Sequence, residues 1–188
     1  MMISAVLDAC VLYSAPLRSF LLWLAYAKQF CPYWSDEIHE EWMRSLINKR
    51  PDLQWERLER TRREMDLQFP ASLVRGYEAI VPTLQLPDPK DRHVLAVAIQ
   101  AKAEYIVTFN LKDFPNPVLQ SYSVNALSPD EFALRLFLQA PFPVLRAVKR
   151  HRLSLKHPPK TVAEYLATLE NQKLPQTVAF LREHEADI

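Results

Sequence analysis

Four acidic side chains and one asparagine stand at places in the chain where they could hold a metal ion. Asp8 directly follows an apolar run, Glu41 lies in "WSDEIHEEW", Asp91 lies in "PDPKDRHVLA", and Asn110 and Asp113 lie in "TFNLKDF". Several carboxylates in one place repel one another unless they are protonated or bridged by cations. Mg²⁺ or Mn²⁺ suits such oxygen ligands better than Zn²⁺, which prefers His and Cys. These residues therefore predict a magnesium or manganese site, provided that the fold brings them together.

Each of these residues also has a simpler structural explanation. Asp8 could cap the turn that follows it, and Asn110 and Asp113 are residue types that are common in loops. Asp88, followed by a proline, makes a good helix start. Asp91 differs, because it lies on the inward apolar face of the same helix. A helix cap does not require a carboxylate that points toward the sheet. The combination, rather than any single residue, favours a metal site.

Helical geometry separates the neighbouring Glu40 and Glu41. A helix expected over 35–49 carries an apolar stripe formed by Ile38, Trp42 and Leu46. Glu41 borders on this stripe and needs a partner there, whereas Glu40 points away from it. Glu41 is therefore the better candidate for the site. His93 is expected off the inward face of its own helix, at the surface or beside the ligands.

The order of the expected elements places these residues at one edge of a sheet. Strands are expected at 3–7, 30–34, 104–109 and 122–127, helices at 16–28, 35–49, 52–69, 89–102 and from residue 128, and an extended segment at 81–86. Strands that alternate with helices predict a parallel, three-layer α/β/α sheet of four or five strands. Sites in such sheets form at the carboxyl ends of the strands, where Asp8 and Asn110 fall.

The chain changes character after Pro143. Residues 144–188 show helical segments and no strand signal, and "TVAE" (161–164) is a capping box. We therefore expect a domain over 1–140 and a helical C-terminal extension over 141–188. The extension holds the most basic stretch of the chain, and its candidate RNA-binding residues are Arg146, Lys149, Arg150, Arg152 and Lys156. A solvated helix face explains this stretch equally well.

Composition limits the classes of function. The net charge of +1 gives no bulk attraction for nucleic acid, so any such role depends on local patches. Cys10 and Cys31 lack metal-type spacing and form no disulfide framework, which fits a cytoplasmic protein. The amino terminus does not resemble a signal peptide, and "FLLWLAYA" (20–27) is too short to cross a membrane. The helix around it has more apolar faces than one core requires, so we expect part of it, with the helix at 52–69, to form a homodimer or partner surface.

The four acidic motifs, taken in order, resemble those of PIN-domain ribonucleases, and in particular VapC-type toxins with a helical C-terminal extension. The opening "LDACVL", then "WSDEIHEEW", "PDPKDRHVLA" and "TFNLKDFP" carry this resemblance, and "PPKTVAEYLATLE" resembles the extension. The resemblance covers essentially the whole chain. It implies hydrolysis of RNA by metal-activated water and an antitoxin partner that blocks the acidic pocket.

The resemblance also implies roles for individual residues. Asp8 and Asp91 would be metal ligands, and Glu41 would hold a water molecule or a second ion. The fourth motif has Asn110 where Asp is frequent, so either Asn110 or Asp113 would complete the metal site. Ser35, Asp88 and Thr108 are expected as auxiliary residues.

Other classes of protein remain open on the sequence alone. A nuclease that acts on DNA or flap structures would use the same acids. A phosphotransferase that forms a phosphoaspartate at Asp8 is disfavoured, because Cys10 stands where a second Asp is customary. A non-catalytic PIN scaffold would not need candidate acids at all four motifs.

Overall fold

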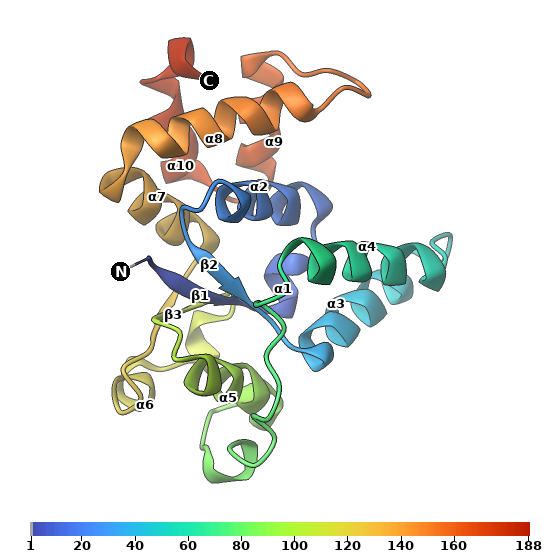
Figure 1. The fold of residues 1–188 in the computed structure, drawn as a ribbon, viewed down its shortest axis with the longest axis vertical. Coiled ribbons are helices and arrows are strands. Elements are labelled where there is room, and N and C mark those ends of the chain that lie inside the picture. Colours follow the sequence, from blue (N-terminus) through green and yellow to red (C-terminus); the bar gives the residue numbers. More distant parts are fainter. Residues whose placement is uncertain (1) are drawn as a thin grey trace. The chain divides into compact units, whose positions relative to one another are not determined.

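The computed structural model describes residues 2–188, and strands and helices alternate along most of that range (Figure 1). The strands are β1 (Ser4–Leu7), β2 (Cys31–Tyr33), β3 (Tyr105–Val107) and β4 (Asn125–Leu127). The helices are α1 (Ala9–Leu12), α2 (Ala15–Tyr26), α3 (Asp36–Lys49), α4 (Trp55–Gln68), α5 (Arg92–Ala101), α6 (Asn116–Gln120), α7 (Pro129–Gln139), α8 (Pro141–Ser154), α9 (Val162–Asn171) and α10 (Pro175–Arg182). Short 3₁₀ turns are η1 (Val81–Thr83), η2 (Pro89–Asp91), η3 (Leu111–Asp113) and η4 (Glu185–Asp187). Within residues 2–188, no helix is long and apolar enough to cross a bilayer.

The four strands form one parallel sheet in the order β2-β1-β3-β4. Leu7 of β1 lies opposite Val107 of β3, and Val6 lies opposite Tyr33 of β2. The apolar residues of β1 and β3 are buried, as expected for parallel strands that are covered on both faces. Helix α5 packs against β1, β2 and β3 (Figure 1). A helix that connects parallel strands runs back across the sheet, so α5 begins near the carboxyl edge of the strands.

The predicted fold class is confirmed: an α/β chain with a parallel sheet and a helical C-terminal region. The expectation that residues 81–86 are extended is wrong, because this segment contains the 3₁₀ turn η1. Pro82 explains the difference, since proline has a fixed φ and no N–H to donate to a strand. The helix expected over 89–102 starts with the 3₁₀ turn η2 and continues as α5. Trp34 and Trp42 are fully buried, as expected for core residues.

The chain packs as two compact units. The sheet unit consists of Ser4–Tyr13 and Cys31–Leu127, and it contains all four strands. The helical unit consists of the segment ending at Ile3 together with Ser14–Phe30 and Ser128–Ile188. The expected division into 1–140 and 141–188 stays a prediction.

Helix α2 belongs to the helical unit, where α8 and α9 cover it. Its buried residues include Leu17, Phe20, Leu21 and Leu24. Most of the apolar surface of α2 is therefore buried inside the helical unit. Contrary to our expectation, this apolar surface does not indicate a partner-binding face. Tyr26 stays 59% exposed. A homodimer stays a prediction that now lacks this support.

The basic stretch of the helical unit offers fewer free charges than the sequence suggested. Arg146, Lys149, Arg150 and Lys156 are exposed. Arg152 instead donates to the carbonyl oxygens of Lys160 (2.9 Å) and Ile188 (3.4 Å) and so holds the end of the chain. His151 is buried and contacts Tyr165, and burial, together with the charge of Lys160, lowers its pKa to about 4. RNA binding by the four exposed residues stays a prediction.

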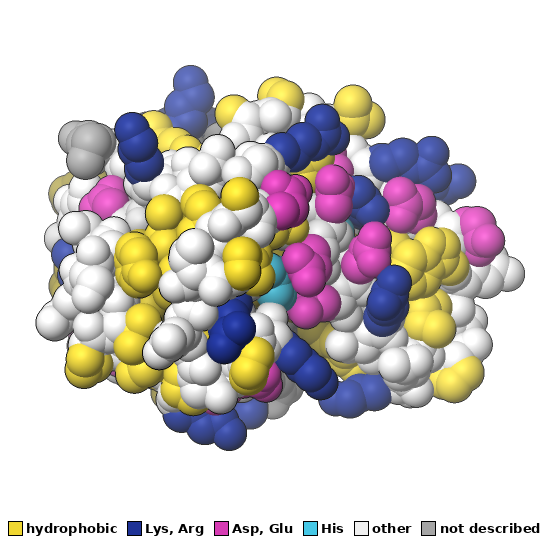
Figure 2. Space-filling model, turned by 90° about the horizontal axis from the view of Figure 1, so that it is seen from below, with side chains coloured by type: hydrophobic (Ala, Val, Ile, Leu, Met, Phe, Trp, Pro, Cys, Tyr) yellow, Lys and Arg dark blue, Asp and Glu magenta, His cyan; other side chains and the backbone are white. Residues whose placement is uncertain are grey.

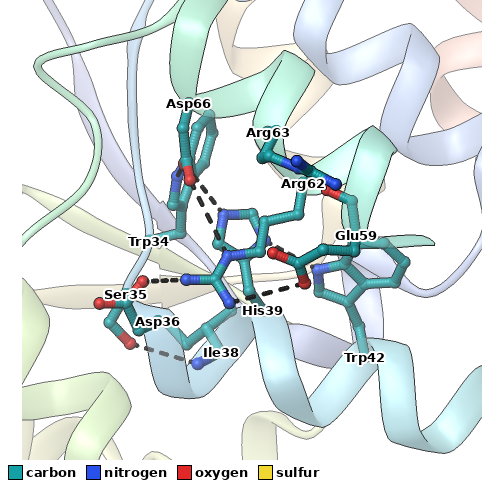
Figure 3. A network of polar contacts seen from close by, with 10 residues as sticks. All are labelled: Trp34, Ser35, Asp36, Ile38, His39, Trp42, Glu59, Arg62, Arg63 and Asp66. Atoms are coloured by element: carbon teal, nitrogen blue, oxygen red, sulfur yellow. Dashed lines mark hydrogen bonds and ion pairs between the residues drawn. The ribbon is translucent and has the colours of Figure 1, made fainter. Parts of the chain in front are cut away.

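A polar network joins β2, α3 and α4 in the sheet unit (Figure 3). Asp66 accepts hydrogen bonds from Trp34 Nε1 (2.8 Å) and His39 Nε2 (3.2 Å). Trp42 Nε1 in turn donates to His39 Nδ1 (3.0 Å), which fixes the proton of the neutral imidazole on Nε2. Burial lowers the pKa of His39 against the opposing effect of Asp66. Arg62 on α4 forms an ion pair with Asp36 at the start of α3. This ion pair adds to the hydrogen bonds that join the two helices.

Asp66→Ala is expected to destabilise the fold. The change leaves the donors of Trp34 and His39 without their acceptor, and both side chains are fully buried. Unsatisfied buried donors make a loss of about 2–4 kcal/mol the expected result, which lowers the melting temperature by roughly 5–10 °C. Asp52→Ala is the control, because Asp52 forms only an exposed pair with Arg50. Equal melting temperatures for the two variants would contradict a stabilising role for the network.

Candidate active site

Two neighbouring strand ends bring Asp8 and Thr108 together. Asp8 follows β1, and its backbone N–H donates to the carbonyl oxygen of Val107 at 3.1 Å. Thr108 Oγ1 donates to Asp8 Oδ2 at 2.6 Å, and it accepts the backbone N–H of Asn110 at 3.0 Å. Asp8 is buried, and its side chain makes no cap hydrogen bond to α1. The simple cap explanation for Asp8 is therefore wrong.

Cys10 also contacts Asp8, which the sequence did not suggest. Its Sγ lies 3.2 Å from Asp8 Oδ2 and 3.4 Å from Thr108 Oγ1. Burial, reinforced by the negative charge of Asp8, raises the pKa of Cys10 to about 12. The group is thus a neutral thiol that donates a weak hydrogen bond to the carboxylate. Thr108 and Cys10 together hold one oxygen of Asp8 and fix the direction of its carboxylate.

Asp91 lies at the junction of η2 and α5 and makes no side-chain cap hydrogen bond. Its pKa is raised to about 6, first by burial and then by the negative charges of Asp8, Asp88, Asp113 and Glu41. The acids singled out in the sequence are therefore close enough to act on one another. Besides adding negative charge near Asp91, Asp88 caps η2, since its side chain accepts the backbone N–H of Lys90 at 2.9 Å.

Glu41 contacts His93. We expected His93 to lie off the inward face of its own helix. His93 is only 3% exposed, with Nε2 at 3.2 Å from Glu41 Oε1 and Nδ1 at 3.7 Å from Glu37 Oε2. Burial lowers the pKa of His93, but the contacts with Glu41 and the charges of Glu37 and Asp8 outweigh it, so the net pKa is raised. Neither ring nitrogen has a hydrogen bond of good geometry within residues 2–188, so the contact with Glu41 is an ion pair only when His93 is protonated. Glu40 instead pairs with Arg44 at the surface, as expected.

A cavity of about 660 Å³ joins these side chains. Its lining residues are Asp8, Ala9, Cys10, Tyr13, Glu41, Arg44, Ser45, Asn48, Lys49, Asp91 and Asn110. Asp113 does not line it and acts on Asp91 through its charge. Ser35 caps α3 by accepting the backbone N–H of Ile38 at 3.2 Å, away from the cavity lining. Figure 2 shows acidic side chains gathered on one face, with a histidine beside them and Lys and Arg nearby.

The donor set fits a hard divalent cation. In the part of the chain that the structure describes, no three His, Cys, Asp or Glu side chains lie close enough together to hold a metal ion among them. The carboxylates of Asp8, Glu41 and Asp91 nevertheless line one cavity, and no Lys or Arg among residues 2–188 forms an ion pair with them. Their mutual repulsion, visible in the raised pKa of Asp91, is the kind that a cation relieves.

Comparison with known families agrees with this geometry. A family described as "PIN domain" matches residues 4–112, which include β1, α3, α5 and β3. The chain belongs to the PIN domain family. The matched part of this PIN domain contains Asp8, Glu41, Asp91 and Asn110, whereas Asp113 lies just beyond it.

The region after the PIN domain has its own likeness. A family described as "VapC50 C-terminal domain" matches residues 129–183. A curated protein of Mycobacterium tuberculosis (strain ATCC 25618 / H37Rv), named "Putative ribonuclease VapC50", is 58% identical over 45 residues, or 24% of this chain and 27% of that protein. The similarity thus spans about a quarter of that relative's length. No solved structure matches the chain.

Proposed function

We propose that the chain is a Mg²⁺- or Mn²⁺-dependent endoribonuclease, the toxin of a toxin–antitoxin pair. The observation that carries this proposal is the single cavity at the sheet edge that Asp8, Glu41 and Asp91 line without a Lys or Arg ion partner among residues 2–188. Membership of the PIN domain family and the likeness to a protein named as a ribonuclease support it.

Asp8 and Asp91 would hold the metal ion, with Asn110 or Asp113 completing the site. Such an ion lowers the pKa of water and neutralises charge on the phosphoryl oxygens. Asn110 is the better supported of the two candidates, because it lines the cavity. Hydrogen bonds from Thr108 and Cys10 to Oδ2 keep the carboxylate of Asp8 in a fixed orientation. Ser35 and Asp88 would contribute from outside the metal site, by capping the first turns of α3 and η2.

Glu41 would accept a hydrogen bond from the attacking water. Its carboxylate stays paired with His93, so the water meets an oriented acceptor. The water would form a new bond to phosphorus in line with the 3′ oxygen while its proton passes to Glu41. The 3′ oxygen would depart with the electron pair of the broken P–O bond and take up a proton from solvent. The expected ends are therefore a 5′-phosphate and a 3′-hydroxyl.

Sequencing of the RNA ends tests this proposal. The purified wild-type chain is incubated with RNA and, in parallel, with DNA of the same sequence, in the presence of Mn²⁺. The proposal expects RNA fragments with 5′-phosphate ends that are absent when EDTA is added. Ends with a 2′,3′-cyclic phosphate would overturn the mechanism, because the RNA's own 2′-hydroxyl forms them. Preferential cleavage of DNA would overturn the substrate.

An antitoxin protein is the partner that this function requires. Its support is the likeness of residues 129–183 to the C-terminal domain of the VapC50 family. The cavity at Asp8 and Asp91 is the site such a partner would block. A cytoplasmic location follows from the proposed RNA substrate.

His93→Ala is expected to lower RNA cleavage by about 10- to 100-fold, as is typical when the partner of a site residue is removed. The loss follows because Glu41 would no longer have the His93 ring beside it to orient its carboxylate. Initial rates at several RNA concentrations should place the loss in kcat rather than in KM. His151→Ala is the control, since His151 is a buried histidine of the helical unit. An unchanged kcat in His93→Ala would show that Glu41 does not depend on His93.

A further inference from the structure

One wall of the active-site cavity is not acidic. Arg44, Ser45, Asn48 and Lys49 of α3 line the same cavity as Asp8, Glu41 and Asp91. They supply a guanidinium, a hydroxyl, an amide and an ammonium group, all of which donate hydrogen bonds. The cavity therefore has an acidic end and a donor-rich, basic end.

Helical geometry explains why both ends belong to one helix. Arg44 and Ser45 lie three and four residues after Glu41, and Asn48 lies four and three residues after them, so the four residues share one face of α3. Lys49 lies one residue further, in the last turn. The rise of an α-helix places Lys49 about 12 Å along the axis from Glu41. The positive groups are thus separated from the acids but open into the same cavity.

The two cations are available to a ligand. Arg44 forms an exposed pair with Glu40, with side chains 71% and 46% exposed, and such pairs are weak. The ammonium of Lys49 lies 5.2 Å from the ring centroid of Tyr13. No acidic side chain pairs with Lys49 in the part of the chain that the structure describes. The contact with Tyr13 holds Lys49 at the cavity without neutralising it.

We propose that Arg44, Asn48 and Lys49 bind the phosphodiester next to the one that is cleaved, in a single-stranded RNA. The inference rests on the proposed nuclease function and adds a binding subsite to it. A polyanion whose reacting phosphate lies at the acidic end must place a neighbouring phosphate further along the cavity, where these donors lie. Contacts to phosphate raise the affinity for any sequence and carry no base preference. Tyr13 supports Lys49 through the contact between its ring and the ammonium group.

The subsite also accounts for the source of positive charge. The exposed cations of α8 are more numerous, but they belong to the helical unit. Arg44 and Lys49 line the cavity that contains the candidate catalytic acids. Arg44 and Lys49 thus belong to the same unit as the acids and line the same cavity, which places them where a bound substrate can meet them.

Binding of RNA without cleavage tests the proposal. Arg44→Ala and Lys49→Ala are each made in the Asp91→Asn background, and a fluorescein-labelled single-stranded RNA is titrated by fluorescence anisotropy at several salt concentrations. Each change is expected to weaken binding about tenfold, which corresponds to the loss of one charged hydrogen bond. The slope of log K against log salt should fall by about 0.7 for each contact that is lost.

Arg50→Ala in the same background is the matched control. Arg50 lies next to Lys49 and carries the same charge, but it forms an exposed pair with Asp52 and does not line the cavity. Its removal should leave both the affinity and the salt slope nearly unchanged. Equal losses in the Lys49→Ala and Arg50→Ala variants would overturn the subsite, because they would show that only net charge matters.

The two proposals fail separately. If the wild-type chain cleaves RNA but Arg44→Ala and Lys49→Ala bind like the control, the subsite is wrong and the nuclease stands. If Arg44 and Lys49 are needed for binding but the wild-type chain never cleaves RNA, the phosphate subsite stands and the nuclease is wrong.

Discussion

Asp91→Asn is expected to lower RNA cleavage by about a thousandfold or more. The change removes the charge of a proposed oxygen ligand while keeping the size of the side chain. Stabilisation of the transition state by a metal ion amounts to several kcal/mol, and each 1.4 kcal/mol is about tenfold in rate. Initial rates at saturating Mn²⁺ measure the loss.

Asp88→Asn provides the comparison for this result. Asp88 lies three residues earlier and caps η2, a role that Asn fulfils equally well. Its loss of activity should stay within about tenfold. Similar losses for Asp88→Asn and Asp91→Asn would mean that general negative charge, rather than a ligand at residue 91, supports cleavage.

The same Asp91→Asn change should make the chain more stable in metal-free buffer. The folded chain raises the pKa of Asp91 from 3.8 to about 6, so ionised Asp91 opposes folding. This cost is absent below about pH 4, grows between about pH 4 and 6, and is constant above. The full shift would be about 3 kcal/mol, and solvent screening of this half-exposed group reduces it to about 1 kcal/mol. A rise in melting temperature of about 2–4 °C at pH 7.5, absent at pH 4, is the expected result.

Adding the metal should reverse the order of stability. A ligand at 100 times its Kd stabilises the folded state by about 2.7 kcal/mol, which raises the melting temperature of the wild-type chain by roughly 5–10 °C. Asp91→Asn should show little of this gain, and EDTA should remove both the gain and the RNA cleavage. Melting curves with and without Mn²⁺ at pH 7.5 measure it. An equal gain in both chains would place the ion elsewhere.

Much of the site followed from the sequence because strand ends are local features. Asp8 comes directly after β1, and Thr108 directly after β3. Neighbouring parallel strands in register must bring these two positions together, and the structure shows a hydrogen bond of 2.6 Å between them. The direction of the Asp8 carboxylate was not predictable, since it depends on Cys10 and Thr108.

Burial around α5 explains why His93 was misplaced. We expected a helix with one inward face and one outward face. In the structure, six consecutive residues from His93 to Ala98 are buried, so α5 has no solvent face there. Periodicity cannot distinguish faces on such a helix. A buried histidine beside two glutamates is a tertiary feature that no local pattern shows.

The basic wall of the cavity was missed for a related reason. In the sequence, the densest run of Lys and Arg lies at residues 146–160. Arg44 and Lys49 are separated by uncharged residues, and they share the cavity only because α3 turns them to the side of Glu41. Their place depends on how α3 lies beside α1 in the sheet unit.

Titration of Mn²⁺ into the metal-free chain at pH 7.5, followed by electron paramagnetic resonance, shows whether the acids at the sheet edge bind a divalent cation. If the acids at the sheet edge form a dication site, the wild-type chain binds the ion saturably, and both Asp8→Asn and Asp91→Asn lose that binding. Equal Mn²⁺ binding by all three chains, or none by the wild type, would contradict the account.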